Sequence, residues 1–132
     1  MKVTDVIVTA RERPAPRRPV ADALQVLDSP GDVDVTIRTD AGIDGHGACI
    51  FGRVAGAARS LAALIENELK GLVVGTDPVF VRRTHAAMLR QTEYHGSGGL
   101  TMFAVATLDT ALWDCLGRAA CRAGSSGAPA AR

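Results

Sequence analysis

The chain has 132 residues, which is the size of one domain and long enough to bury a hydrophobic core. Hydrophobic residues make up 47% of it, which argues against an intrinsically disordered chain. The formal net charge of +1 gives no general electrostatic attraction to nucleic acid or to a membrane surface, so neither is expected as a partner.

The three cysteines indicate a reducing environment. Cys49, Cys115 and Cys121 are an odd number at unrelated spacings, which fits neither a disulfide framework nor a zinc motif. The first residues lack the apolar centre of a signal peptide, and we expect no segment of membrane-spanning length. A cytoplasmic location is therefore expected.

Three segments are predicted to form an antiparallel sheet. Residues 2–10 are rich in β-branched side chains, residues 33–39 alternate apolar and polar, and residues 43–51 follow a turn and are rich in glycine. The segment between the first two strands interleaves arginine with proline, so we predict a long loop there, either a mobile connector or a binding loop. Its arginines are Arg11, Arg13, Arg17 and Arg18.

Three helices are predicted after the strands. Residues 54–72 are amphipathic, and residues 76–93 begin with Asp77 as N-cap and Pro78 in the first turn. The third, after the glycines at 96–99, is mostly apolar, and we expect Trp113 to be buried in the core. The fold class is therefore α+β, a three-stranded antiparallel meander packed on a bundle of about three helices.

The acidic residues of the last helix are predicted to be structural. Asp109 and Asp114 are five residues apart, so they point in different directions and cannot act as a paired acid and base. We expect a hydrogen bond or an ion pair for each of them. The glycines before this helix either bind an anion or allow close packing, and packing is favoured because no phosphate-binding motif is present.

The histidines do not suggest a metal site. His46, His85 and His95 lie on three different predicted elements, with no second ligand three or four residues away. His85 is predicted to lie on a helix surface. His46 lies in the glycine-rich strand near Phe51, where it either contacts a ligand or is simply part of the strand.

Three motifs resemble one known family. The hairpin Thr39–Gly47 (TDAGIDGHG) is similar to T-D-x-G-x-x-G-x-G, and Gly75–Pro78 (GTDP) to G-x-D-P. Residues 99–120 carry the specific ALWD segment followed by C-L-G-R-A-A. Together they resemble, over about residues 1–120, the N-terminal capping domain of the mandelate racemase/muconate lactonizing enzyme group of the enolase superfamily.

The resemblance implies a division of labour between two domains. In this family Mg²⁺ and the acid/base residues belong to a C-terminal β/α barrel, where the metal stabilises an enediolate formed by removing a proton next to a carboxylate. The chain ends before such a barrel begins, so we expect it to contribute no catalytic residue and no metal ligand, and to be inactive alone. The barrel would be its partner.

The resemblance also implies two lid loops, at about residues 14–32 and 46–53, which close over the barrel and contact a small carboxylate substrate. The sequence of residues 47–53 favours an acid-sugar dehydratase over a racemase. Ala48 replaces a glutamate that is frequent in the family pattern. The lid candidates are Arg17, Arg18, His46, Phe51 and Arg53.

The family pattern stops after Ala120. We expect residues 121–132 to form a non-family, disordered tail, produced either by a frameshift or by a short protein with a disordered end. Sequencing the gene beyond this codon tests the frameshift, because in-register barrel sequence should appear in another frame.

Two functions follow. As an isolated capping domain, the chain should expose the face meant for the barrel and self-associate or form homo-oligomers. The alternative is a stand-alone interaction or anion-binding module that uses the Arg11–Arg18 loop and the 46–53 hairpin. That module should be monomeric and bind anions saturably.

Overall fold

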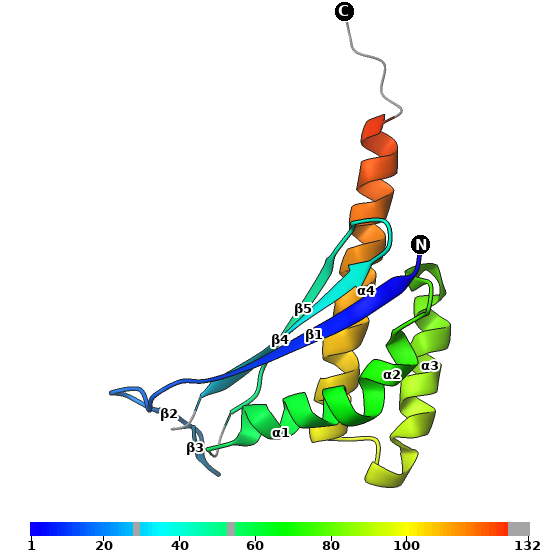
Figure 1. The fold of residues 1–132 in the computed structure, drawn as a ribbon. Helices are drawn as coiled ribbons and strands as arrows, with labels where there is room; N and C mark the ends of the chain where they lie inside the picture. Colours follow the sequence, from blue (N-terminus) through cyan, green and yellow to red (C-terminus); the bar gives the residue numbers. More distant parts are fainter. Residues whose placement is uncertain (28–29, 53–54, 127–132) are drawn as a thin grey trace, which may run out of the picture.

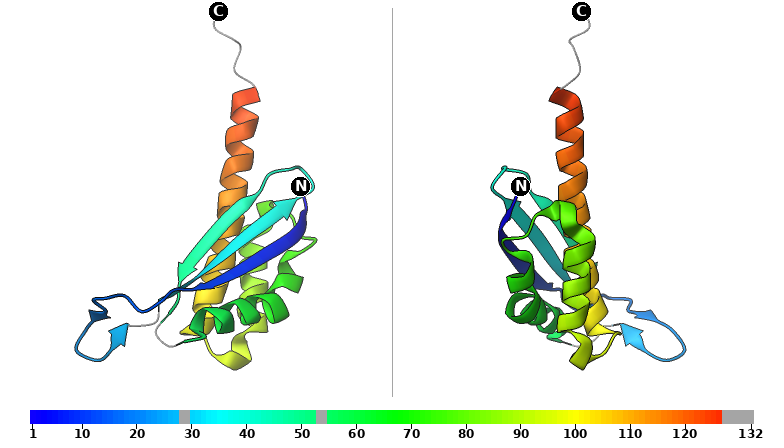
Figure 2. Two further views of the ribbon diagram at one scale, coloured as in Figure 1. Left: turned by 60° about the vertical axis from the view of Figure 1, so that its left-hand side comes forward. Right: turned by 90° about the vertical axis from the view of Figure 1, so that its right-hand side faces the viewer.

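A three-stranded antiparallel sheet packs with one face on the helices, as Figures 1 and 2 show for this computed structural model. The strand order is β1-β4-β5, so the central strand β4 pairs with the two others. This confirms the predicted meander and the α+β class. The strands are β1 (Val3–Glu12), β4 (Gly31–Thr39) and β5 (Gly45–Ile50), and the structure describes residues 1–27, 30–52 and 55–126.

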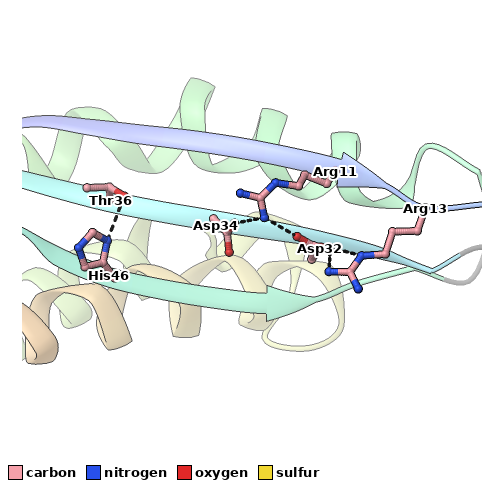
Figure 3. Close-up of polar contacts among 6 residues, drawn as sticks. All are labelled: Arg11, Arg13, Asp32, Asp34, Thr36 and His46. Atoms are coloured by element: carbon pink, nitrogen blue, oxygen red, sulfur yellow. Dashed lines mark hydrogen bonds and ion pairs between the residues drawn. The ribbon is translucent and has the colours of Figure 1, made fainter.

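The alternation along β4 separates a core face from an open face. Val33, Val35 and Ile37 are fully buried against the helices. Asp32 and Thr36 point the other way, toward neighbours that the register places opposite them on β1 and β5. The polar residues of the sheet therefore gather on the face that the helices leave uncovered (Figure 3).

The helices follow the predicted order. The first predicted helix is continuous but contains a π-helical turn, and the second begins as a 3₁₀ turn at the predicted cap, where the Asp77 carboxylate accepts the Val79 N–H at 3.0 Å. The segments are α1 (Ala57–Leu64), η1 (Ile65–Leu69), α2 (Lys70–Val73), η2 (Pro78–Phe80), α3 (Val81–Gln91), η3 (Glu93–His95) and α4 (Leu100–Ser126).

The helix α4 runs along the back of the sheet and contacts β5 most closely (Figure 1). Gly45 and Gly47 allow this approach. A Cβ atom on Gly45 would lie 2.2 Å from the Ala111 carbonyl oxygen, and one on Gly47 would lie 2.2 Å from that of Thr107. The glycine-rich composition of β5 therefore serves packing against α4, because any side chain there would push the helix away.

The position of Trp113 corrects a prediction. Its neighbour Leu112 is fully buried, but Trp113 is 48% exposed. Successive residues on a helix are about 100° apart, so the step from Leu112 to Trp113 leaves the buried face, which Leu108, Ala111 and Leu112 form. The apolar composition of the segment predicted that most of its sides are covered and that Trp113 is buried, but Trp113 lies on the face that stays open.

The helix α4 also corrects the expectation about membrane-spanning length. Residues Leu100–Ala123 form a helix long and apolar enough to cross a membrane by length and composition. However, Leu108 and Leu112 of this helix are fully buried in the core formed with the sheet. Core packing against the sheet accounts for its apolar residues.

Two further expectations differ from the structure. The predicted loop between the first two long strands contains a small hairpin, β2 (Val20–Ala21) with β3 (Val26–Leu27). Its turn is held by Asp22, whose carboxylate accepts the N–H groups of Leu24 and Gln25. Residues 121–126, expected in a disordered tail, continue α4, because Ala119, Ala120 and Ala123 favour the helix. Residues 127–132 lie outside the described residues.

Candidate functional site

The two predicted lid segments begin at the same end of the sheet. The hairpin β2–β3 and the segment after β5 both lie beside the start of β4 (Figures 1 and 2). Main-chain hydrogen bonds join their bases to the first residue of β4 and to the residue before it. The Arg13 N–H donates to the Pro30 carbonyl at 2.9 Å, and the Phe51 N–H donates to the Gly31 carbonyl at 2.8 Å. The fold therefore places the two segments together, as a pair of lids requires.

A network of charged side chains lies on the open face at this end of the sheet (Figure 3). Asp32 accepts hydrogen bonds from Arg13 Nε at 2.8 Å and from Arg11 Nη1 at 3.1 Å. Arg11 also forms an ion pair with Asp34. The first two arginines of the predicted basic loop are therefore neutralised by carboxylates of β4, so they are not free to bind an anionic ligand.

The other lid candidates do not all lie at this end of the sheet, because the register pairs His46 with Thr36, four residues along β4 from Asp32. Arg17 and Arg18 are exposed in the segment before β2. His46 lies on the open face of the sheet, where its Nδ1 is 3.2 Å from the Thr36 hydroxyl (Figure 3). Within the described residues, no hydrogen bond, ion pair or ring contact joins these three to one another, and their contact with a ligand stays a prediction.

Phe51 has a packing role. Its ring lies 5.0 Å from that of Phe103, between ring centroids, so it connects the segment after β5 to the first turn of α4. Phe51 is partly buried and packs against the hydrophobic core, and its contact with a ligand stays a prediction. Arg53, the fifth candidate, lies outside the described residues.

The two aspartates of α4 are structural, as predicted. Asp109 is 3.1 Å from His85 Nδ1 on α3, so it links two helices, and His85 is only partly exposed. Asp114 accepts the His46 N–H at 2.8 Å and Arg118 Nε at 2.7 Å. The bond to His46 satisfies a backbone donor on edge strand β5. Sequence reasoning missed this partner because 68 residues separate the two.

The Asp114 contacts predict a pH-dependent loss of stability. The hydrogen bond from Arg118, and next that from the His46 N–H, lower the pKa of this carboxyl from its ordinary 3.8. A lowered folded-state pKa stabilises the fold above the unfolded value, and this contribution is lost as the pH falls through the folded pKa. Urea unfolding should therefore show wild type more stable than Asp114→Asn at pH 7, and the difference should shrink below about pH 4.

The variant Arg118→Gln provides the control for this series, because it removes the first cause of the shift and leaves the carboxyl in place. Wild type should be more stable than Arg118→Gln at pH 7, and this difference in the free energy of unfolding should also shrink at low pH. Its pH-dependent part should be smaller than the one for Asp114→Asn. A difference between wild type and Asp114→Asn that is unchanged from pH 7 to pH 3 would contradict the assignment.

One face of α4 is exposed and carries no charge over most of its length. The exposed positions recur at intervals of three or four residues, which places them on a single stripe. Trp113 is the largest of them, and it borders a shallow hollow shared with Arg82, His85 and Asp109. Exposed apolar stripes with a central tryptophan are typical of protein interfaces. The α4 stripe consists of Phe103, Ala106, Thr110, Trp113, Gly117 and Ala120.

The described residues form no cluster of metal ligands, and two of the three thiols are affected by burial. Among them, no three carboxylate, imidazole or thiolate side chains come together as possible ligands. Burial raises the pKa of the Cys49 and Cys115 thiols, which disfavours their thiolate forms.

Comparisons with known proteins agree with this geometry. Curated relatives include D-galactonate dehydratases of Xanthomonas campestris pv. campestris, 41% identical over 83 residues, and of Variovorax paradoxus, 36% identical over the same length. Each alignment covers 63% of this chain and 20% of the relative. The chain therefore corresponds to about a fifth of the length of these relatives.

Solved structures share the fold. A racemase from Streptomyces coelicolor A3(2) with bound magnesium superimposes with a TM-score of 0.80 at 24% identity, covering 89% of this chain and 32% of that one. An enolase from Bradyrhizobium complexed with magnesium and mandelic acid gives 0.72 at 31% identity, covering 90% and 32%. Residues 4–123 match the family of the mandelate racemase / muconate lactonizing enzyme N-terminal domain. The chain belongs to this family.

Proposed function

We propose that the chain is the capping domain of a Mg²⁺-dependent enzyme that acts on an acid sugar, by removing a proton next to its carboxylate. The observation that carries the proposal is the α4 stripe, an uncharged, exposed helix face on a domain that corresponds to a fifth of its dehydratase relatives. In this proposal the catalytic groups belong to another domain, and the role of this domain is to cover and shape the site that they form.

The partner proposed for the α4 stripe is a C-terminal β/α barrel domain. The dehydratase relatives and the solved neighbours are much longer than this chain. In a capping domain, α4 leads toward the barrel, so its exposed face is well placed to meet it. Trp113 is suited to be the central anchor, because tryptophan is enriched among the residues that contribute most to interfaces.

A dehydratase is favoured over a racemase. The sequence relatives at 36% and 41% identity are D-galactonate dehydratases, whereas the racemase neighbour at 24% identity supports only the fold. The substrate class is a small hydroxy carboxylate. Arg17, Arg18 and His46 are its proposed contacts in the closed lid, because exposed cationic and imidazole groups bind carboxylates. The three free cysteines fit a reducing, cytoplasmic location.

The competing function is a stand-alone anion-binding module. Exposed Arg17 and Arg18 favour it, whereas Arg11 and Arg13 are occupied by Asp32 and do not. The two functions predict opposite behaviour of the isolated chain. A capping domain without its barrel should self-associate through the uncovered α4 stripe, whereas a stand-alone binding module should be monomeric.

Size-exclusion chromatography with light scattering tests the role of the α4 stripe. The purified chain should form dimers or larger species at micromolar concentration, and Trp113→Glu should shift it to monomer. The matched control is Leu24→Glu, since Leu24 is 92% exposed on the β2–β3 hairpin and lies outside the stripe. This control should leave the association unchanged.

A titration of the same samples with D-galactonate separates the two functions. The capping-domain proposal expects no saturable binding and no turnover, with or without Mg²⁺, because the rest of the site is on the other domain. A monomeric chain that binds D-galactonate saturably would contradict the capping role and support the stand-alone module.

A further inference from the structure

The bases of the two lid segments meet at the start of β4. On one side Arg13, just beyond the end of β1, donates its N–H to Pro30. On the other side Phe51, just beyond the end of β5, donates its N–H to Gly31. Residues 30–32 therefore connect the bases of the two segments.

Asp32 is the fixed point of this connection (Figure 3). Its side chain is only 10% exposed, although it carries a carboxylate. One oxygen, Oδ1, accepts Arg13 Nε at 2.8 Å and Nη2 at 2.7 Å, and the other, Oδ2, accepts Arg11 at 3.1 Å. A nearly buried carboxylate needs such partners, because it has lost most of its contact with water. The Asp32 carboxylate therefore fixes the Arg13 side chain against β4.

The packing around Gly31 leaves little freedom at this point. A Cβ atom there would lie 2.8 Å from the Ala58 Cβ, 3.1 Å from the Phe51 carbonyl oxygen and 3.2 Å from the Arg11 carbonyl oxygen. The end of β1, the end of β5 and the helix α1 thus converge on one residue. Because packed groups of this kind move together, a displacement on one side reaches the other.

We propose that Asp32 is a positioning residue that couples the parts of the two lid segments that the structure describes, residues 14–27 and 51–52, so that they open and close as one unit. That the two segments act as lids rests on the proposed function. Their coupling rests on the contacts at the start of β4. In a capping domain, the coupling makes the two loops reach a substrate in a fixed relative position.

Hydrogen exchange on the full 132-residue chain tests the coupling. The first variant is Arg13→Gln, which breaks the contact with Asp32 from the exposed side, since the Arg13 side chain is 65% exposed. Protection factors, corrected for intrinsic rates, should fall at least fivefold at the residue 13 amide and also at the Phe51 amide. The buried Val35 in the central strand reports global opening and should change less than twofold.

Two more variants make the test specific. Asp34→Asn removes the other carboxylate that pairs with Arg11 but does not touch Arg13, so both amides should stay within twofold of wild type. Phe51→Ala removes the ring contact with Phe103 and should lower protection at the Arg13 amide from the opposite side. Arg13→Lys keeps the charge and should restore part of the protection lost in Arg13→Gln.

Two results would overturn the coupling. One is a loss of protection at residue 13 with the Phe51 amide unchanged, which would mean that the loops open separately. The other is an equal loss at Val35, which would mean that the network serves only overall stability. Neither result depends on whether the α4 stripe binds a barrel, so this proposal and the capping function can fail independently.

Discussion

Replacing Gly47 with alanine is expected to lower the free energy of unfolding by about 3 kcal/mol, and Gly45→Ala by a similar amount. The new Cβ would lie 2.2 Å from a carbonyl oxygen of α4 in either variant, so the sheet and the helix must move apart. Domains of this size are stable by roughly 5–15 kcal/mol, which makes this a large fraction of the total. Urea unfolding followed by far-UV circular dichroism measures it.

Gly71→Ala is the matched control for these variants. Gly71 lies in α2, and no atom lies within 4 Å of the position its Cβ would take. Alanine should stabilise the helix there by about 0.5–1 kcal/mol, because it restricts the unfolded chain. If Gly47→Ala were as stable as wild type, the close contact between β5 and α4 would be wrong.

Alanine substitutions at two neighbouring residues of α4 are expected to differ strongly in their effect on stability. Leu112→Ala should destabilise the chain by about 3 kcal/mol, because this side chain is fully buried in the core. Trp113→Ala should cost about 1 kcal/mol or less, since Trp113 is half exposed. Thermal and urea unfolding measure both, on samples dilute enough to be monomeric.

The two substitutions should have the opposite order of effects on self-association. Trp113→Ala should weaken self-association of the isolated chain, whereas Leu112→Ala should affect it only through partial unfolding. Equal destabilisation by the two substitutions would mean that Trp113 belongs to the core, as the sequence had suggested, and that the α4 stripe is not an interface.

Much of the fold could be predicted because local patterns agree with it. The alternation of residues 33–39 placed β4 and its core face correctly, and the Asp77–Pro78 pair marked the start of the second helical segment. The motif ending in Leu112-Trp113-Asp114 identified the family, which the match over residues 4–123 confirms.

Other features depend on contacts between distant residues and could not be predicted. The glycines of β5 were recognised as unusual, but the reason for them is the approach of α4, which lies about 60 residues later in the chain. The burial of Trp113 was wrong because composition does not tell which face of an apolar helix is left open. The β2–β3 hairpin was missed because strands of two residues carry no periodicity.

The candidate site was predicted in outline but not in its charges. The arginine cluster of residues 11–18 was treated as one basic loop, whereas Arg11 and Arg13 are bound to the carboxylates of β4. That pairing follows from the register between β1 and β4, which puts Arg11 opposite Asp32. Only Arg17 and Arg18 of the cluster remain candidates for a ligand.

The central claim is that this domain caps the active site of a longer enzyme, and a chimera tests it most directly. Residues 1–120 would replace the corresponding N-terminal segment of the Xanthomonas campestris D-galactonate dehydratase. The account predicts Mg²⁺-dependent dehydration of D-galactonate by the chimera, and a loss of at least tenfold in kcat/KM when Trp113→Glu is added. A chimera that unfolds cooperatively at the temperature of the intact dehydratase, yet shows no turnover, would contradict it.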